Sequence, residues 1–309
     1  MADAHAERVK GIFSQIARKY DLFNALSSFG IYRSWLRRVA RAASCDGGDR
    51  VLDVAGGTGD VAFTLCELCP PASIELTDFT PEMLDVAAER IARGEGRGVP
   101  CDLNVVDAHR LPYGDGAFTV VTCAYGLRNF SRRRRAMEEA ARVLAPGGRY
   151  VVLEFGTPPH ALWRALYRFY LAHMIPLIGG LVTGDRAGFE YLRDSIEAFP
   201  PQGEIADELM YISENGGMVC DGRKIVSFEA MPQQLVCAAV ELVLCSRGQP
   251  GAALACSGML GAALCAADPA LACGAAGLAC GAAAACILAP GRRVEAAAAY
   301  AGGCVTGVL

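Results

Sequence analysis

A glycine-rich turn and a later acid are the residues of this chain best suited to bind a small molecule. Val51–Asp60 places three glycines directly after a short apolar run that contains Asp53, and Asp60 then opens a helical pattern. Glycines allow the backbone to approach a ligand closely. Asp78 ends the next apolar run, nineteen residues after Gly59. A carboxylate at that place in an open α/β sheet can accept both hydroxyls of a ribose, so the two features together predict a nucleoside site.

Two further strand ends carry polar side chains. Leu103–Ala108 is predicted as the third strand and contains Asp107, which could accept from an adenine amine or cap the next turn. The residues alone leave both interpretations open. The fourth run, Ala117–Ala124, is followed by Arg128 and Asn129. Because α/β folds of this kind keep their sites at the carboxyl ends of the strands, the Arg-Asn pair indicates a functional position.

The residues between these motifs predict the elements that position them. Five apolar runs, the last at Arg149–Phe155, alternate with helical patterns, which is typical of a parallel doubly wound α/β sheet. Lys224–Met231 and Leu235–Leu244 predict a closing hairpin of two strands. Two helical pieces within residues 7–44 precede the first strand. Residues 158–182 form a broad apolar and aromatic helical surface, which fits either packing on the sheet or the wall of an apolar substrate channel or membrane-facing lid.

Composition limits the partners and the compartment. The net charge of −4 gives no reason to expect a nucleic-acid partner. The first eight residues contain acids and no apolar core, unlike a signal peptide, so we expect a cytoplasmic protein with reduced cysteines. The close pair Cys66 and Cys69 lacks a second pair to complete a metal site. We therefore interpret this pair as packing and expect no metal.

Two stretches fit a membrane contact as an alternative interpretation. Arginines beside Trp35 share one side of the second helical piece, which fits a solvated face or a membrane-surface contact: Arg33, Arg37, Arg38 and Arg41. In residues 247–309, 33 of the 63 residues are Ala or Gly, with six cysteines. So few large side chains cannot fill a core, and we therefore expect disorder or loose helix there. A membrane helix over Pro269–Pro290 is the alternative.

Several motifs together resemble one known family. Six groups of residues occur in the same order in the ubiquinone/menaquinone biosynthesis C-methyltransferases: Lys19–Asp21; Ser28–Ile31 with Trp35; Asp53–Asp60; Gly126–Asn129; Pro146–Gly148 with Leu153–Phe155; and Tyr191-Leu192 with Ser195-Ile196. The resemblance covers about residues 8–200 closely and 201–246 by pattern. The Ala-Gly-Gly-Thr-Gly-Asp turn and the Gly-Leu-Arg-Asn tip distinguish this family from other methyltransferases.

The resemblance implies a class I methyltransferase fold. Such a fold is Rossmann-like, with a seven-stranded, mostly parallel, doubly wound sheet and an antiparallel last strand. The implied methyltransferase domain covers residues 1–246, with an N-terminal helical cap over 1–47 and a substrate-side helical insertion over 158–200. The tail 247–309 has no counterpart in the family.

The resemblance also implies S-adenosylmethionine as cofactor and assigns residues to it. Thr58, with the turn glycines Gly57 and Gly59 after Asp53, would hold its methionine part. Asp78 would hold the ribose, and Asp107 with Ala108 would flank the adenine. Ala124 stands where many relatives have serine, so one polar contact would come from the backbone or be missing. Arg128, Asn129 and Tyr20 would be the catalytic residues.

The implied activity is methyl transfer to a ring carbon of a polyprenylated hydroquinone. The expected substrate is demethylmenaquinol, with the 2-polyprenyl-6-methoxy-benzoquinol precursor of ubiquinone as a second. The alternatives are a methyltransferase of another small apolar phenol and a noncatalytic scaffold for quinone-synthesis enzymes. A homodimer and a peripheral contact at the inner face of the membrane stay open.

Overall fold

A computed structural model describes residues 4–28, 31–156, 161–182 and 187–216 of the 309-residue chain. The predicted closing hairpin and the tail lie outside the described residues. The chain divides into two compact units. The sheet unit comprises the described parts of residues 1–20, 35–156 and 194–228, and the helical unit comprises those of residues 21–34, 157–193 and 229–309.

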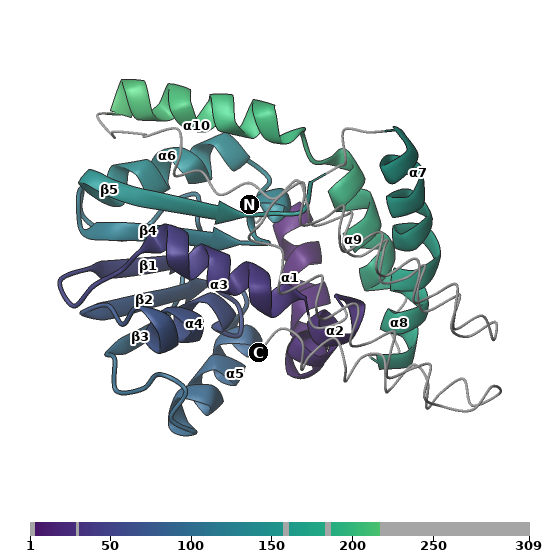
Figure 1. Cartoon of the computed structure of the whole chain (residues 1–309), viewed down its shortest axis with the longest axis horizontal. Helices are drawn as coiled ribbons and strands as arrows, with labels where there is room; N and C mark the ends of the chain where they lie inside the picture. The colour runs from purple at the N-terminus through teal and green to yellow at the C-terminus, as the bar shows by residue number, and fades with distance from the viewer. Residues whose placement is uncertain (1–3, 29–30, 157–160, 183–186, 217–309) are drawn as a thin grey trace, which may run out of the picture. The chain divides into compact units, whose positions relative to one another are not determined.

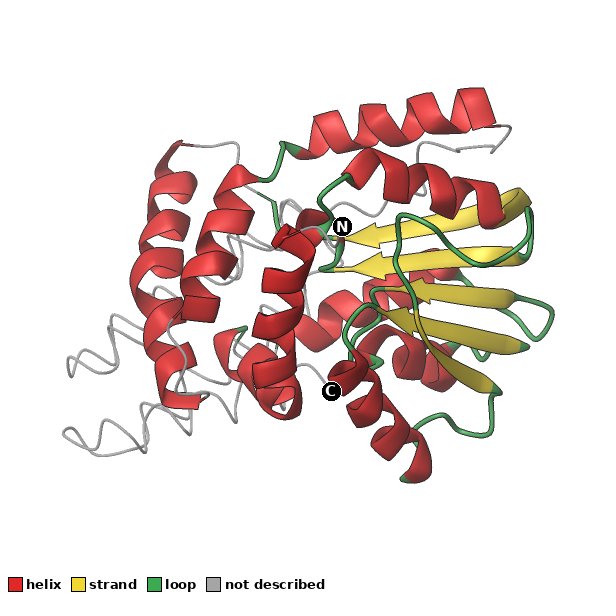
Figure 2. Ribbon diagram, turned by 180° about the vertical axis from the view of Figure 1, so that it is seen from behind, coloured by secondary structure: helices red, strands yellow, loops and turns green. Residues whose placement is uncertain are grey.

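The sheet unit contains a five-stranded sheet within the described residues (Figures 1 and 2). Its strands are β1 (Arg50–Val54), β2 (Ser73–Asp78), β3 (Cys101–Val105), β4 (Phe118–Ala124) and β5 (Leu144–Leu153). The order is β3-β2-β1-β4-β5, and all four pairings are parallel. The strand order reverses between β1 and β4, which is where doubly wound sheets bind ligands. The parallel α/β fold is therefore confirmed, and the expected total of seven strands stays a prediction.

Helices connect the strands and cover the sheet. They are α1 (Ala4–Ile16) with the 3-10 turn η1 (Ala17–Lys19), α3 (Tyr32–Ala43), α4 (Asp60–Leu68), α5 (Pro81–Ala92), α6 (Arg133–Val143) and α10 (Gln202–Gly216). Helix α6 lies against β5 and α10, and α5 lies against β2, β3 and α1 (Figure 1). None of the described helices combines the length and apolar character that crossing a membrane requires.

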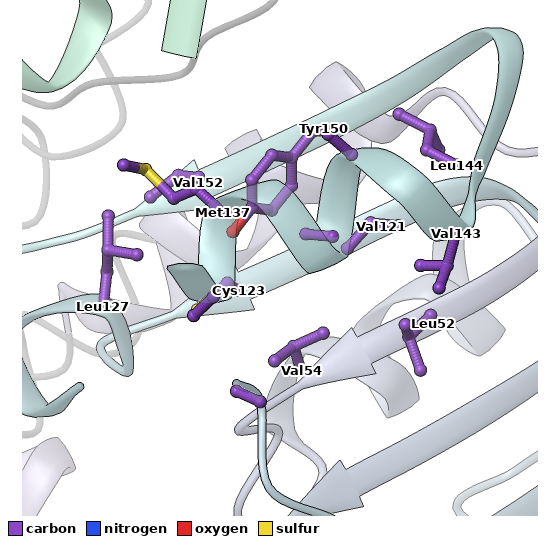
Figure 3. Close-up of a cluster of buried hydrophobic side chains, with 14 of the residues drawn as sticks. Leu52, Val54, Val121, Cys123, Leu127, Met137, Val143, Leu144, Tyr150 and Val152 are labelled. Carbon is purple, nitrogen blue, oxygen red and sulfur yellow. The ribbon is translucent and has the colours of Figure 1, made fainter. Parts of the chain in front are cut away.

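One buried cluster joins β1, β4 and β5 to α6 and α10. Figure 3 shows side chains of this cluster from β1, β4, β5 and α6. Val121 and Cys123 of β4 and Val152 of β5 pack with Met137 of α6 and Leu209 of α10. Strand β4 is apolar nearly throughout, as is typical of a central strand of a parallel sheet whose two faces are covered. The cluster fixes the ends of β4 and β5, where the predicted Arg-Asn pair follows.

The helical unit has its own core. It contains α2 (Tyr20–Ser27) from Asp21 onward, α7 (Ala161–Phe169), a π-helical turn (Tyr170–Met174), α8 (Ile175–Val182) and the first part of α9 (Ala187–Ala198). The Phe23 and Phe189 rings lie 4.5 Å apart between centroids, and the Tyr170 hydroxyl donates to the Ser27 carbonyl. Tyr167 and Tyr170, from the predicted apolar surface of residues 158–182, are buried.

The structure corrects the membrane interpretation of Trp35. This side chain is 2% exposed and belongs to the core of the sheet unit, so it cannot insert into a membrane surface. Arg33 and Arg41 on the same helix are exposed. The alternation of arginines with apolar residues on α3 therefore separates a solvent-facing side from a buried side.

Candidate active site

The glycine turn follows β1 and leads directly into α4. Gly57 and Gly59 have φ values of 58° and 88°, in the left-handed region that favours glycine. A Cβ atom added to Gly59 would lie 2.5 Å from the Phe63 ring, so a larger residue does not fit. The Gly56 N–H donates to the Thr77 carbonyl of β2 at 2.9 Å, which joins the turn to the neighbouring strand. The turn is thus a narrow cradle at the helix N-terminus, where backbone N–H groups point outward.

Asp78 faces this turn from the end of β2. Its Oδ2 accepts from the Gly57 N–H at 3.0 Å, and its Oδ1 accepts from the Thr80 N–H at 2.8 Å. Burial raises the pKa of Asp78, and hydrogen bonds from backbone N–H groups and from the Thr80 hydroxyl partly oppose that change. Asp78 therefore lies against the turn at the end of a parallel strand, which is where a carboxylate can accept the hydroxyls of a ribose. The structure therefore brings Asp78 and Gly57 together as the sequence predicted.

Asp53 lies beneath the turn and is completely buried. Its Oδ1 accepts from the Thr122 hydroxyl at 2.6 Å, while its Oδ2 has no hydrogen-bond partner among the described residues. Burial raises the pKa of Asp53 to about 7; the Thr122 bond opposes this, and the nearby carboxylates of Asp78 and Asp60 add to it. A buried acceptor without a donor, next to a cradle that excludes side chains, fits a ligand that carries positive charge and hydroxyl groups.

Asp107 lies in the loop after β3, because the strand ends at Val105 rather than at the predicted Ala108. Its Oδ1 accepts from both the backbone N–H and the Nδ1 of His109, at 2.9 and 2.6 Å. The Arg132 N–H donates to Nε2 of His109 at 3.2 Å, which places the ring proton on Nδ1. These bonds support the capping interpretation of Asp107. An adenine contact by Asp107 with the buried Ala108 stays a prediction.

The tip after β4 is folded tightly around the Tyr125 carbonyl. Arg128 Nη1 and Asn129 Nδ2 both donate to this oxygen, at 2.7 and 3.2 Å. The Tyr125 N–H donates to the Leu153 carbonyl of β5 at 2.7 Å. A Cβ atom added to Gly126 would lie 2.7 Å from the Cβ of Ala55 in the glycine turn. The tip that follows Ala124 and the glycine turn therefore lie directly against each other.

Arg128 forms a buried ion pair with Glu154, which follows β5. Nη1 of Arg128 lies 2.6 Å from Oε1, and the two side chains are 3% and 7% exposed. The backbone N–H groups of Arg128 and Phe155 also donate to this carboxylate, at 3.1 and 2.9 Å. Glu154 is not among the predicted site residues, although an acid at the end of the fifth apolar run carries the same signal as Asp78. The pair fixes the guanidinium and balances its charge.

Tyr20 reaches the same tip from the end of η1. Its ring packs edge-to-face against Phe13, with centroids 5.9 Å apart. The pKa of Tyr125 is raised well above its ordinary value, first by burial and next by the nearby Tyr20 phenol. The Tyr125 hydroxyl has no hydrogen-bond partner among the described residues, and its ring lies 4.8 Å from that of Phe155. Tyr20 and Arg128 both lie close enough to Tyr125 to change its pKa.

Comparison with known proteins gives the same family as the motifs. The family model described as the ubiE/COQ5 methyltransferase family matches residues 1–221. A demethylmenaquinone methyltransferase from Thermus thermophilus is 45% identical over 61% of this chain and 84% of its own length. The demethylmenaquinone methyltransferase of Deinococcus radiodurans is 42% identical, over 65% and 82%. A ubiquinone/menaquinone biosynthesis C-methyltransferase UbiE from Shewanella pealeana is 36% identical, over 70% and 84%. The chain therefore belongs to the ubiE/COQ5 methyltransferase family.

Proposed function

We propose that this methyltransferase transfers the methyl group of S-adenosylmethionine to a ring carbon of a polyprenylated hydroquinone, with demethylmenaquinol as its substrate. The observation that carries this proposal is the naming of two relatives, 45% and 42% identical, as demethylmenaquinone methyltransferases, because this chain covers 84% and 82% of their lengths. The relative from Shewanella pealeana is named for both quinone pathways. The benzoquinol precursor of ubiquinone is therefore the second candidate substrate.

The residues around the glycine turn fit the cofactor. We assign the methionine part to Gly57, Thr58 and Gly59, the ribose to Asp78, and the adenine to Asp107 and Ala108. The position of Asp78 at the end of β2, where it accepts from the Gly57 N–H of the turn, supports the ribose assignment. Asp53 Oδ2 supplies a buried hydrogen-bond acceptor beneath the turn. Ala124 has no side-chain donor or acceptor, so any polar contact at that strand end comes from the backbone.

The chemistry requires an activated carbon nucleophile. When bound, S-adenosylmethionine supplies an electrophilic methyl group. Ionisation of a ring hydroxyl raises the electron density on the adjacent ring carbon, so the protein must favour the phenolate and align the carbon. Arg128 would stabilise the phenolate directly or through a water molecule, and Asn129 would orient the ring. Tyr20 would close the pocket against solvent.

The Arg128–Glu154 pair refines this role. A guanidinium that is fixed by a carboxylate carries little net charge into the site, so it acts mainly by directed hydrogen bonding. Its position is set by the Tyr125 carbonyl and by the Phe155 ring, which lies 5.1 Å from the guanidinium carbon. A guanidinium paired in this way can stabilise a phenolate oxygen by a hydrogen bond without attracting other anions strongly.

A polyprenylated substrate lies in a membrane, so we also propose a peripheral contact with the membrane surface. Among its described side chains, the helical unit exposes the large apolar residues Leu22 and Leu26 of α2 and Phe169 of α7. These residues, and not the buried Trp35, are the candidates for that contact. Vesicle flotation of the wild-type chain and of a Phe169→Ser variant tests this assignment, and equal recovery would remove Phe169 from it.

The substrate is tested with purified protein, methyl-labelled S-adenosylmethionine and a panel of naphthoquinols and benzoquinols under reducing, oxygen-free conditions. We expect the label on a ring carbon of the demethylated naphthoquinol, and less transfer to the benzoquinol. The oxidised quinone is the matched control, because it has no hydroxyl to ionise. Label on oxygen, or preferred transfer to a small phenol without a prenyl chain, would overturn the proposal.

A further inference from the structure

Arg90 lies on α5, outside the residues assigned to the cofactor, and its side chain reaches the glycine turn. Its Nη1 donates to the Thr58 carbonyl at 3.1 Å and to the Asp60 carboxylate at 2.8 Å. The side chain is 13% exposed although it carries a full charge. One guanidinium nitrogen therefore joins the last residues of the turn to the first residue of α4.

Two further contacts hold the guanidinium in this position. Its Nε donates to Oε2 of Glu95 at 2.8 Å, and its carbon lies 4.7 Å from the centre of the Phe63 ring. Phe63 is also the ring that fills the space beside Gly59. A planar guanidinium can make directed hydrogen bonds and lie on an aromatic ring at the same time, which an ammonium group cannot. The geometry is thus specific to arginine.

Negative charges near the turn explain why a cation is needed there. Asp53, Asp60 and Asp78 all lie close to it, and Asp60 and Asp78 both raise the pKa of Asp53. These carboxylates repel one another in a partly dry region, which disfavours the compact form of the turn. The ion pair with Arg90 offsets the charge of Asp60. It also satisfies the Thr58 carbonyl, which would otherwise compete for donors within the turn.

We propose that Arg90 is a positioning residue that holds Thr58 to Asp60 in the conformation that binds S-adenosylmethionine. The proposal rests on the assignment of the glycine turn to the cofactor. The affinity for a ligand falls in proportion to the fraction of the protein that is in the binding conformation. Because Arg90 holds the turn in that conformation, it lowers the dissociation constant of the cofactor. It does not touch the reacting atoms, so the methyl-transfer step at saturating cofactor does not depend on it.

The test compares Arg90→Met and Arg90→Lys with a matched control, Arg93→Met. Arg93 lies at the end of the same helix and also pairs with Glu95, at 3.4 Å, but its side chain is 62% exposed. Isothermal titration with S-adenosylhomocysteine and S-adenosylmethionine gives the dissociation constants, and steady-state kinetics gives kcat and KM. We expect Arg90→Met to raise the dissociation constant about 10- to 100-fold, from the loss of two hydrogen bonds between charged or buried groups.

The other expected results separate positioning from general structure. The kcat of Arg90→Met at saturating cofactor stays within about twofold of wild type, and Arg93→Met matches wild type in every constant. Arg90→Lys has an intermediate dissociation constant, because lysine can reach one acceptor but cannot keep the Glu95 contact as well. An unchanged dissociation constant in Arg90→Met, or a kcat that falls while binding is unchanged, overturns the proposal. If Arg90→Met does not fold, Arg90→Lys decides, and wild-type affinity in that variant overturns it.

Asp78→Asn distinguishes failure of this inference from failure of the site assignment. We expect it to weaken cofactor binding, because an amide cannot accept from both the backbone donors and two ribose hydroxyls. If Asp78→Asn binds as wild type does, the turn is not the cofactor site and the proposed assignment fails. If Asp78→Asn loses affinity while Arg90→Met does not, only the role of Arg90 fails.

Discussion

Replacement of Asp53 by Asn should reveal the energetic cost of the buried carboxylate beneath the glycine turn. Asn has nearly the same shape and keeps an oxygen that can accept from the Thr122 hydroxyl, which now donates to Oδ1 at 2.6 Å. It cannot ionise. The variant therefore separates the charge of Asp53 from its packing, and the difference between variant and wild type should depend on pH.

The magnitude follows from the pKa of Asp53, which burial raises from an ordinary 3.8 to about 7. Well below the ordinary value of 3.8 the carboxyl is protonated in the folded and unfolded chains, so the wild type has no penalty there. As pH rises from about 4 to about 7, the unfolded chain releases the proton first, so wild-type stability falls. Each unit of difference between the folded and unfolded pKa corresponds to about 1.4 kcal/mol, so the full loss in the free energy of unfolding is about 4 kcal/mol. About 3 kcal/mol of this loss occurs between pH 5 and pH 8.

The assay is urea unfolding of the cofactor-free protein at pH 5 and pH 8, followed by far-ultraviolet circular dichroism. We expect the free energy of unfolding of Asp53→Asn, relative to wild type, to be about 3 kcal/mol higher at pH 8 than at pH 5. Asp102→Asn on β3 is the control, because that acid is exposed and should leave the pH dependence unchanged. Identical pH dependence in wild type and Asp53→Asn would refute the argument that burial raises the pKa of this carboxyl.

Three further substitutions test the active-site tip and the turn. Arg128→Ala should lower kcat at least about 100-fold while the dissociation constant of S-adenosylmethionine changes less than about twofold, as titration and steady-state kinetics would show; an unchanged kcat removes Arg128 from catalysis. Glu154→Ala leaves a buried guanidinium without its carboxylate, so urea unfolding should show that the free energy of unfolding falls by about 3–5 kcal/mol. Glu208→Ala, which breaks a more exposed ion pair, should lower it by less than about 1 kcal/mol. Equal losses in the two variants would contradict the argument that burial makes the Arg128–Glu154 pair important. Gly59→Ala should abolish cofactor binding, because the added Cβ atom meets the Phe63 ring. Gly94→Ala has the same φ of 88° but open space around it, so it should lower the free energy of unfolding by only about 1 kcal/mol. Cofactor binding retained by Gly59→Ala would show that the narrow turn is not needed.

The sequence predicted which strand ends meet at one edge of the sheet because the pattern of a parallel sheet determines it. Strands covered on both faces read as continuous apolar runs, and their carboxyl ends all lie at one edge. The glycine turn, Asp78 and the Arg128–Asn129 tip can therefore be placed together from the order of the apolar runs. The predicted third strand extends to Ala108 instead of ending at Val105, because Val106 and Ala108 are apolar although they lie in the following loop.

Contacts between distant residues could not be predicted in the same way. The Arg128–Glu154 pair joins residues 26 positions apart, and Arg90 reaches Asp60 over 30 positions. A charged side chain in a single sequence does not reveal its partner, because many acids and bases lie at similar distances along the chain. Trp35 shows the same limit, since a helix with arginines on one side does not indicate which element covers the other side.

The central claim, transfer of a methyl group to a ring carbon of a naphthoquinol, is tested most directly by nuclear magnetic resonance with two labels. The wild-type protein is incubated with S-adenosylmethionine carrying a carbon-13 methyl group and with a short-chain demethylmenaquinol enriched in carbon-13 at the unsubstituted ring carbon. We expect a one-bond carbon–carbon coupling between the two labels in the product. A methyl group attached to oxygen, or a substrate recovered without the label, would contradict the account.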